Sequence, residues 1–405
     1  MKINKKIVQI NTVCNTSTGQ IMHDIQLAAQ REGYDTISFV GRRKVYTDLK
    51  CEKFGNFFSF WTHVVLTVLF DCQGYGSFFS TKKLIKRLRE EKPDIIHLHN
   101  LHGYYLNLPL LFRYLDNEFK GKIYWTFHDC WPFTGHCPYF VMAECDKWKR
   151  GCYKCPQKSQ YPISLCFDAS SLNYRRKKAM FTALESLVII TPSEWMKDLV
   201  KASFFNTMQV NVINNGIDIG IFHPCQDIRQ LRDVLHKYNI PSNKKILLGV
   251  ASIWEKRKGL DLFISLAEQI PEKYIIVLVG LTPRQIKRMP KSIIGLVRVE
   301  SKEELAILYS SSQIFINPSM EESFSLVTVE AMACGTPVIA LDTSAVKELV
   351  DTESGIVLSE NKPEAYIDAI QRIENAEMRR EKIAESACKY SKERMVDRVL
   401  QLYRE

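Results

Sequence analysis

The sequence lacks any apolar run long enough to cross a lipid bilayer. Its longest apolar stretch, FFSFWTHVVLTVLF at residues 57–70, spans only 14 residues and contains Ser59 and His63, whereas a membrane-spanning helix needs about 20 residues. The N-terminal residues MKINKKIVQIN begin a strand pattern without the apolar core of a secretory signal, so we expect a cytoplasmic protein. For residues 57–70 the sequence favours a buried helix over one that lies at a membrane surface.

The sequence also has no low-complexity tract and no short-period repeat, which leaves little room for disorder. With 405 residues, of which 46% are apolar, the chain is long enough for two domains of roughly 200 residues, each with its own core. The net charge of +10 favours an anionic partner. It does not distinguish a nucleotide from a phosphorylated lipid, a membrane surface or a nucleic acid.

Apolar runs typical of strands alternate with helical stretches in both halves of the chain. The first half contains KKIVQIN, TISFVG, DIIHLHN, KIYWTFH, SLVIITPS and QVNVIN, and the second half KKILLGVAS, YIIVLVG, LVRVE, QIFINPS, TPVIALD and GIVLS. Most are continuously apolar, as strands covered on both faces are. The order predicts an α/β fold of two Rossmann-like, doubly wound parallel sheets, facing each other across a cleft that is lined by the carboxyl ends of the strands.

The domain boundary is expected in the polar, strand-poor segment that begins at residue 225, where few apolar contacts would cross. We therefore assign residues 1–225 to an N-terminal domain, with a cysteine-rich insertion at 130–160, and residues 226–390 to a C-terminal domain. Residues 391–405 are expected to form a last helix that could pack back on the N-terminal domain.

The stretch EESFSLVTVE at residues 321–330 connects an expected strand to an expected helix that begins near Ser325. Ser323 and Ser325 are candidate caps, and the free N–H groups of a first helical turn favour a phosphate. Glu322 and Glu330 would then offer carboxylates to hydroxyl groups on either side of that phosphate. Both acids could instead be surface residues, but Glu330 lies among apolar residues, where an unpaired carboxylate would be costly.

Further candidates lie near the ends of other expected strands. Lys258 is placed at the start of a helix, where it could neutralise the charge of a leaving diphosphate, although a solvated turn is the alternative. Gly19, in the turn NTSTGQ, would let the backbone approach a ligand closely. His128 ends the run KIYWTFH and could bind a hydroxyl group. We expect His97 and His99 on opposite faces of a strand, as core and acceptor-side residues that do not share a metal.

Four cysteines lie close together in CPYFVMAECDKWKRGCYKC, at residues 137–155. Four thiols within 19 residues can hold a structural zinc ion, although the first spacing is wider than in a standard zinc knuckle. Disulfides are the alternative, and a reducing cytosol disfavours them. The sequence therefore predicts a structural zinc ion bound by Cys137, Cys145, Cys152 and Cys155.

Several of these segments resemble glycosyltransferase family 4, whose members are retaining enzymes of the GT-B fold. EESFSLVTVE is similar to the E-x7-E signature of that family, NVINNGIDIGIFHP to its interdomain segment, SIWEKRKGLDLF to its phosphate-contacting loop, and NTSTGQIMHDIQLAAQREGYDT to its first loop and helix. Together with DIIHLHNLHGYYLNL and WTFHDCWPFTGHC, they cover nearly the whole chain in the family order. The cysteine-rich insertion resembles that of an exopolysaccharide-type subset.

The resemblance implies roles for individual residues. Glu330 would bind the ribose of the donor and Glu322 the hydroxyls of its sugar. The implied catalytic residues are His128, Glu322, Lys258 and Arg257. The implied donor-binding residues are Gly19, Arg257, Lys258, Ser323, Phe324, Ser325, Leu326 and Glu330. This chain has Ser323 and Ser325 where many members have glycine, and it has Ile253 where they have an arginine, for which Arg257 is the proposed substitute.

The function that we expect is retaining transfer of a hexose from a nucleotide-diphosphate sugar to a saccharide or lipid-linked acceptor, in the synthesis of a cell-surface polysaccharide. The resemblance implies no catalytic metal, and the expected partners include the inner membrane surface, through a peripheral contact, but no nucleic acid. A nucleotide-sugar epimerase or phosphorylase of the same fold is one alternative. A zinc-containing protein that binds nucleic acid through its basic surface is the other.

Overall fold

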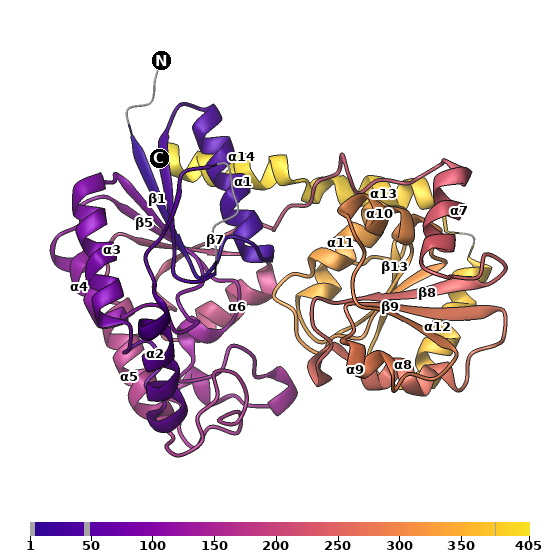
Figure 1. Cartoon of the computed structure of the whole chain (residues 1–405), viewed down its shortest axis with the longest axis horizontal. Helices are drawn as coiled ribbons and strands as arrows, with labels where there is room; N and C mark the ends of the chain where they lie inside the picture. The colour runs from indigo at the N-terminus through magenta and orange to yellow at the C-terminus, as the bar shows by residue number, and fades with distance from the viewer. Residues whose placement is uncertain (1–4, 44–48, 377) are drawn as a thin grey trace. The chain divides into compact units, whose positions relative to one another are not determined.

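The computed structural model describes residues 5–43, 49–376 and 378–405, which form two compact units (Figure 1). The first unit comprises Met1–Asn214 and Met395–Glu405, and the second comprises Asn215–Arg394. The units therefore divide after residue 214. The polar segment that placed the boundary at residue 225 instead contains helix α7 (Ile228–Lys237) of the second unit.

The first unit is built on a parallel sheet with the strand order β3-β2-β1-β4-β5-β6-β7. Its strands are β1 (Lys6–Asn11), β2 (Asp35–Val40), β3 (Cys51–Lys53), β4 (Ile95–Leu98), β5 (Lys122–Thr126), β6 (Leu187–Thr191) and β7 (Gln209–Val212). The strand order changes direction between β1 and β4, which pair directly. In a doubly wound sheet this switch point is where ligands bind, at the carboxyl ends of the strands.

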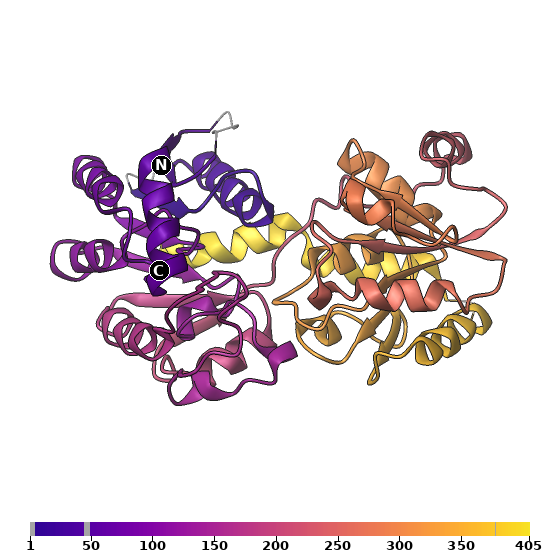
Figure 2. The same cartoon turned by 60° about the horizontal axis from the view of Figure 1, so that its bottom comes forward.

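Helices cover both faces of this sheet (Figures 1 and 2). Side chains alternate along β1, so that Ile7 packs in a core with α1 and α14, whereas Val8 packs in a separate core with α3 and α4. The helices of the unit are α1 (Ser17–Arg31), α2 (Phe57–Phe70), α3 (Phe78–Glu91), α4 (Leu108–Asn117), α5 (Ser170–Phe181), α6 (Glu194–Ala202) and α14 (Lys392–Arg404), which begins within the second unit.

The second unit repeats this plan with the parallel strand order β10-β9-β8-β11-β12-β13. Its strands are β8 (Lys245–Val250), β9 (Tyr274–Val279), β10 (Ile293–Leu296), β11 (Ile314–Asn317), β12 (Val338–Leu341) and β13 (Gly355–Leu358). Besides α7, its helices are α8 (Leu260–Ala267), α9 (Pro283–Ile286), α10 (Lys302–Ser311), α11 (Leu326–Ala333), α12 (Pro363–Asn375) and α13 (Arg380–Ala387). The two doubly wound sheets confirm the predicted fold class, and here the switch point lies between β8 and β11.

The strand predicted at LVRVE was wrong by several residues. Strand β10 ends at Leu296, the first residue of that run, and Val297 is exposed. The strand begins instead at Ile293, whose side chain is buried in the core with Phe263 and Tyr366. Burial of an apolar side chain in the core therefore sets this strand, and not the local alternation of apolar and charged residues.

The last helix, α14, completes the first unit. Its side chains Val399 and Tyr403 are buried in the core that also contains Ile7. The Tyr403 Oη atom lies 2.5 Å from Nδ1 of His97, and the Tyr124 hydroxyl donates a hydrogen bond to the carbonyl of Leu402. The C-terminal residues are thus part of the core beneath β4 and β5.

Helix α2 corrects another expectation. The apolar run at residues 57–70 does form one helix, but only His63 and Thr67 of that helix are buried. The prediction of a buried helix was therefore wrong, because an uninterrupted apolar run does not indicate which face packs inward. Among the helices of the described residues, none combines the length and the apolarity that a bilayer crossing requires.

Candidate functional site

In the second unit, the loops that follow β8 and β11 bring together most of the residues predicted to bind a donor. Lys258 closes a short 3-10 turn, Lys256–Lys258, after β8, and Glu322 lies in the loop between β11 and α11. Strands β8 and β11 pair as neighbours at the switch point of the sheet. The two side chains therefore meet at the position where open α/β sheets bind ligands.

Lys258 and Glu322 form an ion pair in which Nζ donates to Oε1. Their side chains are only 18% and 14% exposed, so water screens the pair weakly. Burial alone would raise the pKa of Glu322, but the positive charges of Lys258 and Arg257 outweigh it and hold that pKa below its ordinary value. Glu322 is therefore a carboxylate at neutral pH, beside a cation that is accessible to a ligand.

Arg257 is a structural neighbour of this pair. Its Nη1 donates to the carbonyl of Glu321 at 2.6 Å, and its Nη2 contacts a carboxylate oxygen of Glu255 at 2.8 Å. The Arg257 carbonyl also accepts a hydrogen bond from the amide of Met320 at 2.9 Å. These contacts join the loop after β8 to the loop after β11 and hold Lys258 close to Glu322.

Helix α11 begins after an unusual serine. Ser325 has φ 92° and ψ 81°, in the left-handed region that favours glycine. It was predicted to cap the helix, but its side chain makes no capping hydrogen bond. Its hydroxyl instead accepts a hydrogen bond from Nδ2 of Asn317 at 3.0 Å and lies 3.0 Å from Thr328 Oγ1. A serine thus adopts the backbone conformation of the glycine that many family members have.

The backbone around Ser325 leaves the first-turn N–H groups of α11 without partners inside the helix. Leu326 is the first residue of that helix, and Phe324 is anchored by its ring, which is buried and packs against Tyr390 at 5.6 Å. These amide groups and the adjacent Lys258 can together receive a doubly charged phosphate group. Ser323 lies in the same loop, one residue after Glu322.

Glu330 is on α11, one turn beyond the first-turn amides. Its Oε2 accepts a hydrogen bond from the hydroxyl of Tyr309, on α10, at 3.2 Å. Burial raises the pKa of Glu330 to about 7, even though the Tyr309 hydrogen bond acts in the opposite direction. A carboxyl group of this pKa exchanges its proton readily near neutral pH, and it can accept hydrogen bonds from hydroxyl groups once it is ionised.

In the first unit, His128 belongs to a chain of buried hydrogen bonds. Its Nε2 lies 3.1 Å from Nδ1 of His99, and Nε2 of His99 lies 3.0 Å from Oε1 of Gln9. The Gln9 amide nitrogen donates to the carbonyl of Met22, so Oε1 of Gln9 accepts from His99. A neutral His99 then accepts at Nδ1 from His128. Nδ1 of His128 is consequently left as a hydrogen-bond acceptor.

Burial keeps these imidazole rings neutral. It lowers the pKa of His128 to about 4, although the nearby Asp129 carboxylate opposes the shift, and it lowers that of His97 to about 3. The prediction that His97 and His99 face opposite ways was wrong, because their rings stack with centroids 4.4 Å apart. Residues two positions apart along a strand share one face.

Gly19 lies in the first turn of α1, and not in the preceding loop as expected. A Cβ atom at this position would lie 2.4 Å from the carbonyl carbon of Cys14 and 2.6 Å from its oxygen. The absence of a side chain is therefore required for α1 to pack against the backbone of the loop after β1. Whether a ligand also approaches Gly19 stays a prediction.

The structure does not support the zinc site predicted in the cysteine-rich insertion. Cys137, Cys145, Cys152 and Cys155 do line one small pocket beside His136. Across residues 5–43, 49–376 and 378–405, however, no group of three or more His, Cys, Asp or Glu side chains is arranged to hold a metal ion. The same residues contain no disulfide. Spacing along the chain did not fix the relative directions of the four thiols.

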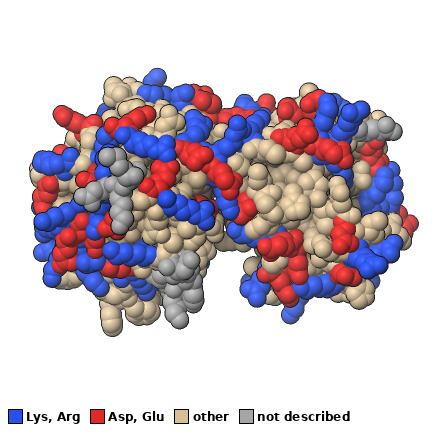
Figure 3. Space-filling model, turned by 90° about the horizontal axis from the view of Figure 1, so that it is seen from above, with Lys and Arg blue, Asp and Glu red and all other residues tan. Residues whose placement is uncertain are grey.

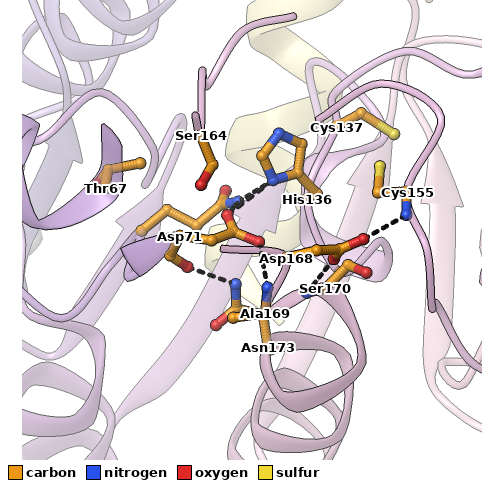
Figure 4. Close-up of polar contacts among 12 residues, drawn as sticks. Thr67, Asp71, His136, Cys137, Cys155, Ser164, Asp168, Ala169, Ser170 and Asn173 are labelled. Atoms are coloured by element: carbon orange, nitrogen blue, oxygen red, sulfur yellow. Dashed lines mark hydrogen bonds and ion pairs between the residues drawn. The ribbon is translucent and has the colours of Figure 1, made fainter. Parts of the chain in front are cut away.

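Hydrogen bonds order this insertion instead (Figure 4). Nδ1 of His136 lies 2.7 Å from a carboxylate oxygen of Asp71, and both side chains are fully buried. Asp168 accepts from the backbone amide of Cys155 at 2.6 Å. The neighbouring Cys137 thiol lowers the pKa of Cys155 to about 7.

The basic residues of the chain do not gather on one surface in the view of Figure 3. Lys and Arg side chains alternate there with Asp and Glu side chains over both units. A surface that follows a nucleic-acid backbone needs a continuous basic stripe. The face in Figure 3 therefore gives no support to the nucleic-acid alternative.

Three residues of these networks escaped the sequence analysis. Gln9 interrupts the apolar run IVQI of β1 and Asn317 ends the apolar run IFIN of β11, and a polar residue at such a position was a usable signal. Both are buried, and each orients a neighbouring candidate residue through its amide group. Tyr309 gave no such signal, because a tyrosine on an amphipathic helix is usually a core residue.

Two family models match separate parts of the sequence. The model described as "Glycosyl transferases group 1" matches residues 232–390, and the one described as "Glycosyltransferase Family 4" matches residues 44–220. WcaC of Escherichia coli (strain K12), described as a colanic acid biosynthesis glycosyl transferase, is 25% identical over 309 residues, which cover 74% of this chain and 72% of WcaC. A D-inositol 3-phosphate glycosyltransferase of Nocardiopsis dassonvillei is 29% identical over 220 residues, about half of each chain.

Solved structures share the fold at low sequence identity. Sucrose-phosphate synthase from Thermosynechococcus elongatus superimposes with a TM-score of 0.72 at 17% identity, and the match covers 99% of this chain and 98% of the synthase. Anabaena HepE in complex with UDP superimposes with a TM-score of 0.68 at 15% identity, and the match covers 99% of each chain. At these identities the likeness concerns the fold alone.

Proposed function

Because this chain belongs to glycosyltransferase family 4 and has the GT-B fold, we propose that it is a retaining hexosyltransferase that uses a nucleotide-diphosphate sugar. The single observation that carries the proposal is the pairing of Lys258 with Glu322 at the switch point of the second sheet, next to the start of α11. The proposed acceptor is a saccharide or a lipid-linked saccharide of a cell-surface polysaccharide. The similarity to WcaC supports this choice.

We assign the nucleotide-diphosphate part of the donor to the second unit. The diphosphate would lie against the first-turn amides of α11, with Lys258 neutralising its charge. Glu330, one turn farther along the helix, would accept hydrogen bonds from the ribose hydroxyls, and Glu322 would bind hydroxyls of the sugar. Support comes from the order of these groups along the chain, which matches the order of ribose, diphosphate and sugar in such a donor. That HepE was crystallised with UDP and with UDP-glucose adds support.

The proposed reaction needs no protein nucleophile. The acceptor hydroxyl oxygen bonds to the anomeric carbon on the face from which the diphosphate departs, the bond from that carbon to the diphosphate oxygen breaks, and the hydroxyl proton passes to the departing diphosphate. Negative charge grows on the diphosphate as the bond breaks, so the Lys258 ammonium stabilises the transition state more than the ground state. We propose that this cation, together with the α11 amides, performs the charge stabilisation without a catalytic metal.

The proposed role of His128 follows from its tautomer. Its bare Nδ1 can accept a hydrogen bond from a sugar hydroxyl, and its low pKa keeps it neutral while it does so. A neutral acceptor positions a hydroxyl group without adding a positive charge near the anomeric carbon. We place this contact with the transferred sugar.

The test begins by identifying the nucleotide. A thermal-shift screen with UDP, GDP and ADP reports which nucleotide raises the melting temperature of the full chain, because a ligand that binds the folded state stabilises it. The matching nucleotide-glucose, with a saccharide acceptor, then serves in a transfer assay. Glu322→Gln is expected to lower kcat by about 100-fold or more, since a preorganised charged contact is lost. The exposed Glu385→Gln, on α13, is the matched control.

The same assay separates the proposal from its enzyme alternatives. An epimerase converts the donor sugar without any acceptor, and a phosphorylase requires inorganic phosphate, so the donor is also incubated alone and with phosphate. The configuration of the anomeric carbon in the product is determined by NMR. An inverted configuration would contradict a retaining mechanism. Unchanged turnover in Glu322→Gln, with donor still bound, would contradict the assignment of the site.

A further inference from the structure

Helix α2 exposes six apolar side chains, whereas its two buried residues, His63 and Thr67, are polar. His63 faces inward, where its Nε2 accepts a hydrogen bond from the amide of Gly74 at 3.0 Å and its Nδ1 lies 3.0 Å from Ser77 Oγ. A surface helix of a soluble protein normally buries its apolar stripe. The exposed side chains of α2 are Phe57, Phe58, Trp61, Val65, Leu69 and Phe70. The two bonds of His63 fix this inverted orientation, because turning the helix would break both.

The exposed apolar surface continues beyond both ends of α2. Helix α3, which packs on α2, begins with Phe78 and Phe79, and Phe79 is 81% exposed. At the other end, the exposed ring of Phe167 stacks on that of Phe70 with centroids 5.7 Å apart, and Leu165 is exposed beside it. We call the exposed side chains of α2 together with these four residues the apolar face. The ribbon of α2 runs along the outside of the first unit in Figure 1.

Two lysines lie beside the apolar face. Nζ of Lys82 lies 4.6 Å from the centroid of the Phe78 ring, and Nζ of Lys158 donates to the carbonyl of Leu165. In the part of the chain that the structure describes, neither lysine forms an ion pair with a carboxylate. Over residues 53–89 the sequence has one acidic residue, Asp71, and its side chain is buried. Beside Phe167, the carboxylate of Asp168 accepts hydrogen bonds from the backbone amides of Cys155 and Ser170. Around the apolar face, cationic side chains therefore outnumber acidic ones.

We propose that the apolar face docks on an anionic lipid surface. Aromatic rings flanked by lysines suit the boundary between acyl chains and headgroups, where the rings enter the apolar layer and the ammonium groups contact lipid phosphates. Helix α2 is about 21 Å long at 1.5 Å per residue, too short to span the bilayer and suited to lie along its surface. The docking would assign the peripheral membrane contact expected from the sequence to named residues.

The proposal rests on the proposed function only in that a lipid-linked acceptor would bring the chain to a membrane. Vesicle binding is measured without donor or acceptor, so a failure to bind would leave the transferase proposal untouched, and a failure of transfer would leave the docking surface untouched. A protein partner would suit the rings equally well. The excess of cations and the near absence of acidic residues favour lipid over a second copy of this chain, whose own face carries the same charge.

The first experiment is flotation of the purified full chain with vesicles. Vesicles of phosphatidylcholine alone are compared with vesicles that also contain phosphatidylglycerol, and we expect binding to the anionic vesicles. Phe58→Ser and Phe79→Ser should each lower the partition coefficient of the protein between vesicles and water by about tenfold. The free energy gained when one phenylalanine ring enters the apolar layer is large enough to produce a change of this size. Ile228→Ser, at an exposed apolar residue of the second unit, is the matched control and should bind as the unsubstituted chain does.

The charge contribution is tested in the same assay. Lys82→Gln should weaken binding to anionic vesicles by about fivefold at low salt and should have little effect on phosphatidylcholine vesicles. The depth to which the apolar face enters the lipid is measured by tryptophan fluorescence, with vesicles of brominated phosphatidylglycerol whose bromine atoms quench a nearby tryptophan. Trp61 lies on the apolar face, so bromine should quench the emission of the unsubstituted chain. Trp61→Phe should bind equally well, because it keeps an aromatic ring, and should lose most of that quenching.

Absence of binding to either vesicle type would overturn the proposal, as would binding that the ring substitutions leave unchanged. Equal binding to both vesicle types would overturn the role of lipid charge. A dimer in size-exclusion chromatography that Phe58→Ser dissociates, without vesicle binding, would assign the apolar face to self-association. Circular dichroism and melting temperature of the variants should match those of the unsubstituted chain, because the replaced rings are exposed and the His63 contacts remain.

Discussion

Glu330 should make the stability of the second unit depend on pH around neutrality, and Glu330→Gln should remove that dependence. Burial raises the pKa of this carboxyl group from 4.5 to about 7 in the folded protein. Below pH 4.5 the group is protonated in both states. As pH rises above 4.5, the unfolded chain releases the proton first, so the free energy of unfolding falls until the pH reaches about 7 and is constant beyond it. Glutamine is neutral throughout.

The size of the effect follows from the shift of the pKa. A difference from 4.5 to about 7 corresponds to about 3 kcal/mol at roughly 1.4 kcal/mol per pH unit. Between pH 4.5 and pH 8, the free energy of unfolding of Glu330→Gln should thus rise by up to about 3 kcal/mol relative to that of the unsubstituted chain. The hydrogen bond from Tyr309 can persist in the variant, because the amide oxygen accepts it.

The measurement is a urea titration, followed by circular dichroism, at half-unit steps from pH 4.5 to pH 8.5. Glu385→Gln, the same substitution at an exposed position of α13, is the control and should give a difference that is flat with pH. A second readout is the side-chain carboxyl carbon resonance of Glu330 in glutamate-labelled protein, assigned by its absence from the variant. It should titrate with a midpoint near pH 7.

A stability difference that stays constant across this range would refute the reasoning, as would a carboxyl resonance that titrates near pH 4.5. Either result would mean that water reaches Glu330 more freely than its burial implies. The proposed contact with ribose would then also lose its physical basis, because it requires a carboxyl group set within a largely apolar helix.

Three further predictions concern other contacts of the two units. The free energy of unfolding of Ser325→Gly should be about 1 kcal/mol higher than that of Ser325→Ala. Both variants lose the hydroxyl group, but only glycine adopts φ 92° without strain. Equal stabilities would contradict strain at this position. A double-mutant cycle of Glu322→Gln and Lys258→Met, measured by urea denaturation, should give a coupling of about 1–3 kcal/mol, whereas additive effects would show that the ion pair contributes little. Tyr403→Phe should lower the free energy of unfolding by about 1–2 kcal/mol by leaving His97 Nδ1 unpaired, and a melting curve identical to that of the unsubstituted chain would contradict it.

The fold class could be predicted from the sequence because continuous apolar runs and helical stretches alternate along the whole chain. Such runs report burial on both faces, which is a property of parallel sheets. The meeting of Lys258 with Glu322 could be predicted for a related reason. Each lies in the loop that follows a buried strand, and strand ends at a switch point converge whatever the details of the loops.

Orientation could not be predicted where packing with distant residues decides it. Helix α2 was recognised as a helix, but its outward apolar face depends on hydrogen bonds of His63 to residues that follow it in the chain. The four cysteines of the insertion were close in sequence, and only the folded loops set the directions of their thiols. The partner of Glu330, Tyr309, comes from a different helix, which no local pattern links to α11.

Helix α14 has a practical consequence for how this chain can be divided. Met395–Glu405 belongs to the first unit. A single cut of the chain, at either boundary between the units, therefore does not yield a complete first unit. A fragment that stops at residue 214 would expose the apolar surface that α14 covers. It would also lack the Leu402 carbonyl, which accepts a hydrogen bond from the Tyr124 hydroxyl, and the Tyr403 hydroxyl, which contacts His97. A circularly permuted gene, in which the last helix is joined by a short linker to the first strand, is the design that keeps that half intact for separate expression.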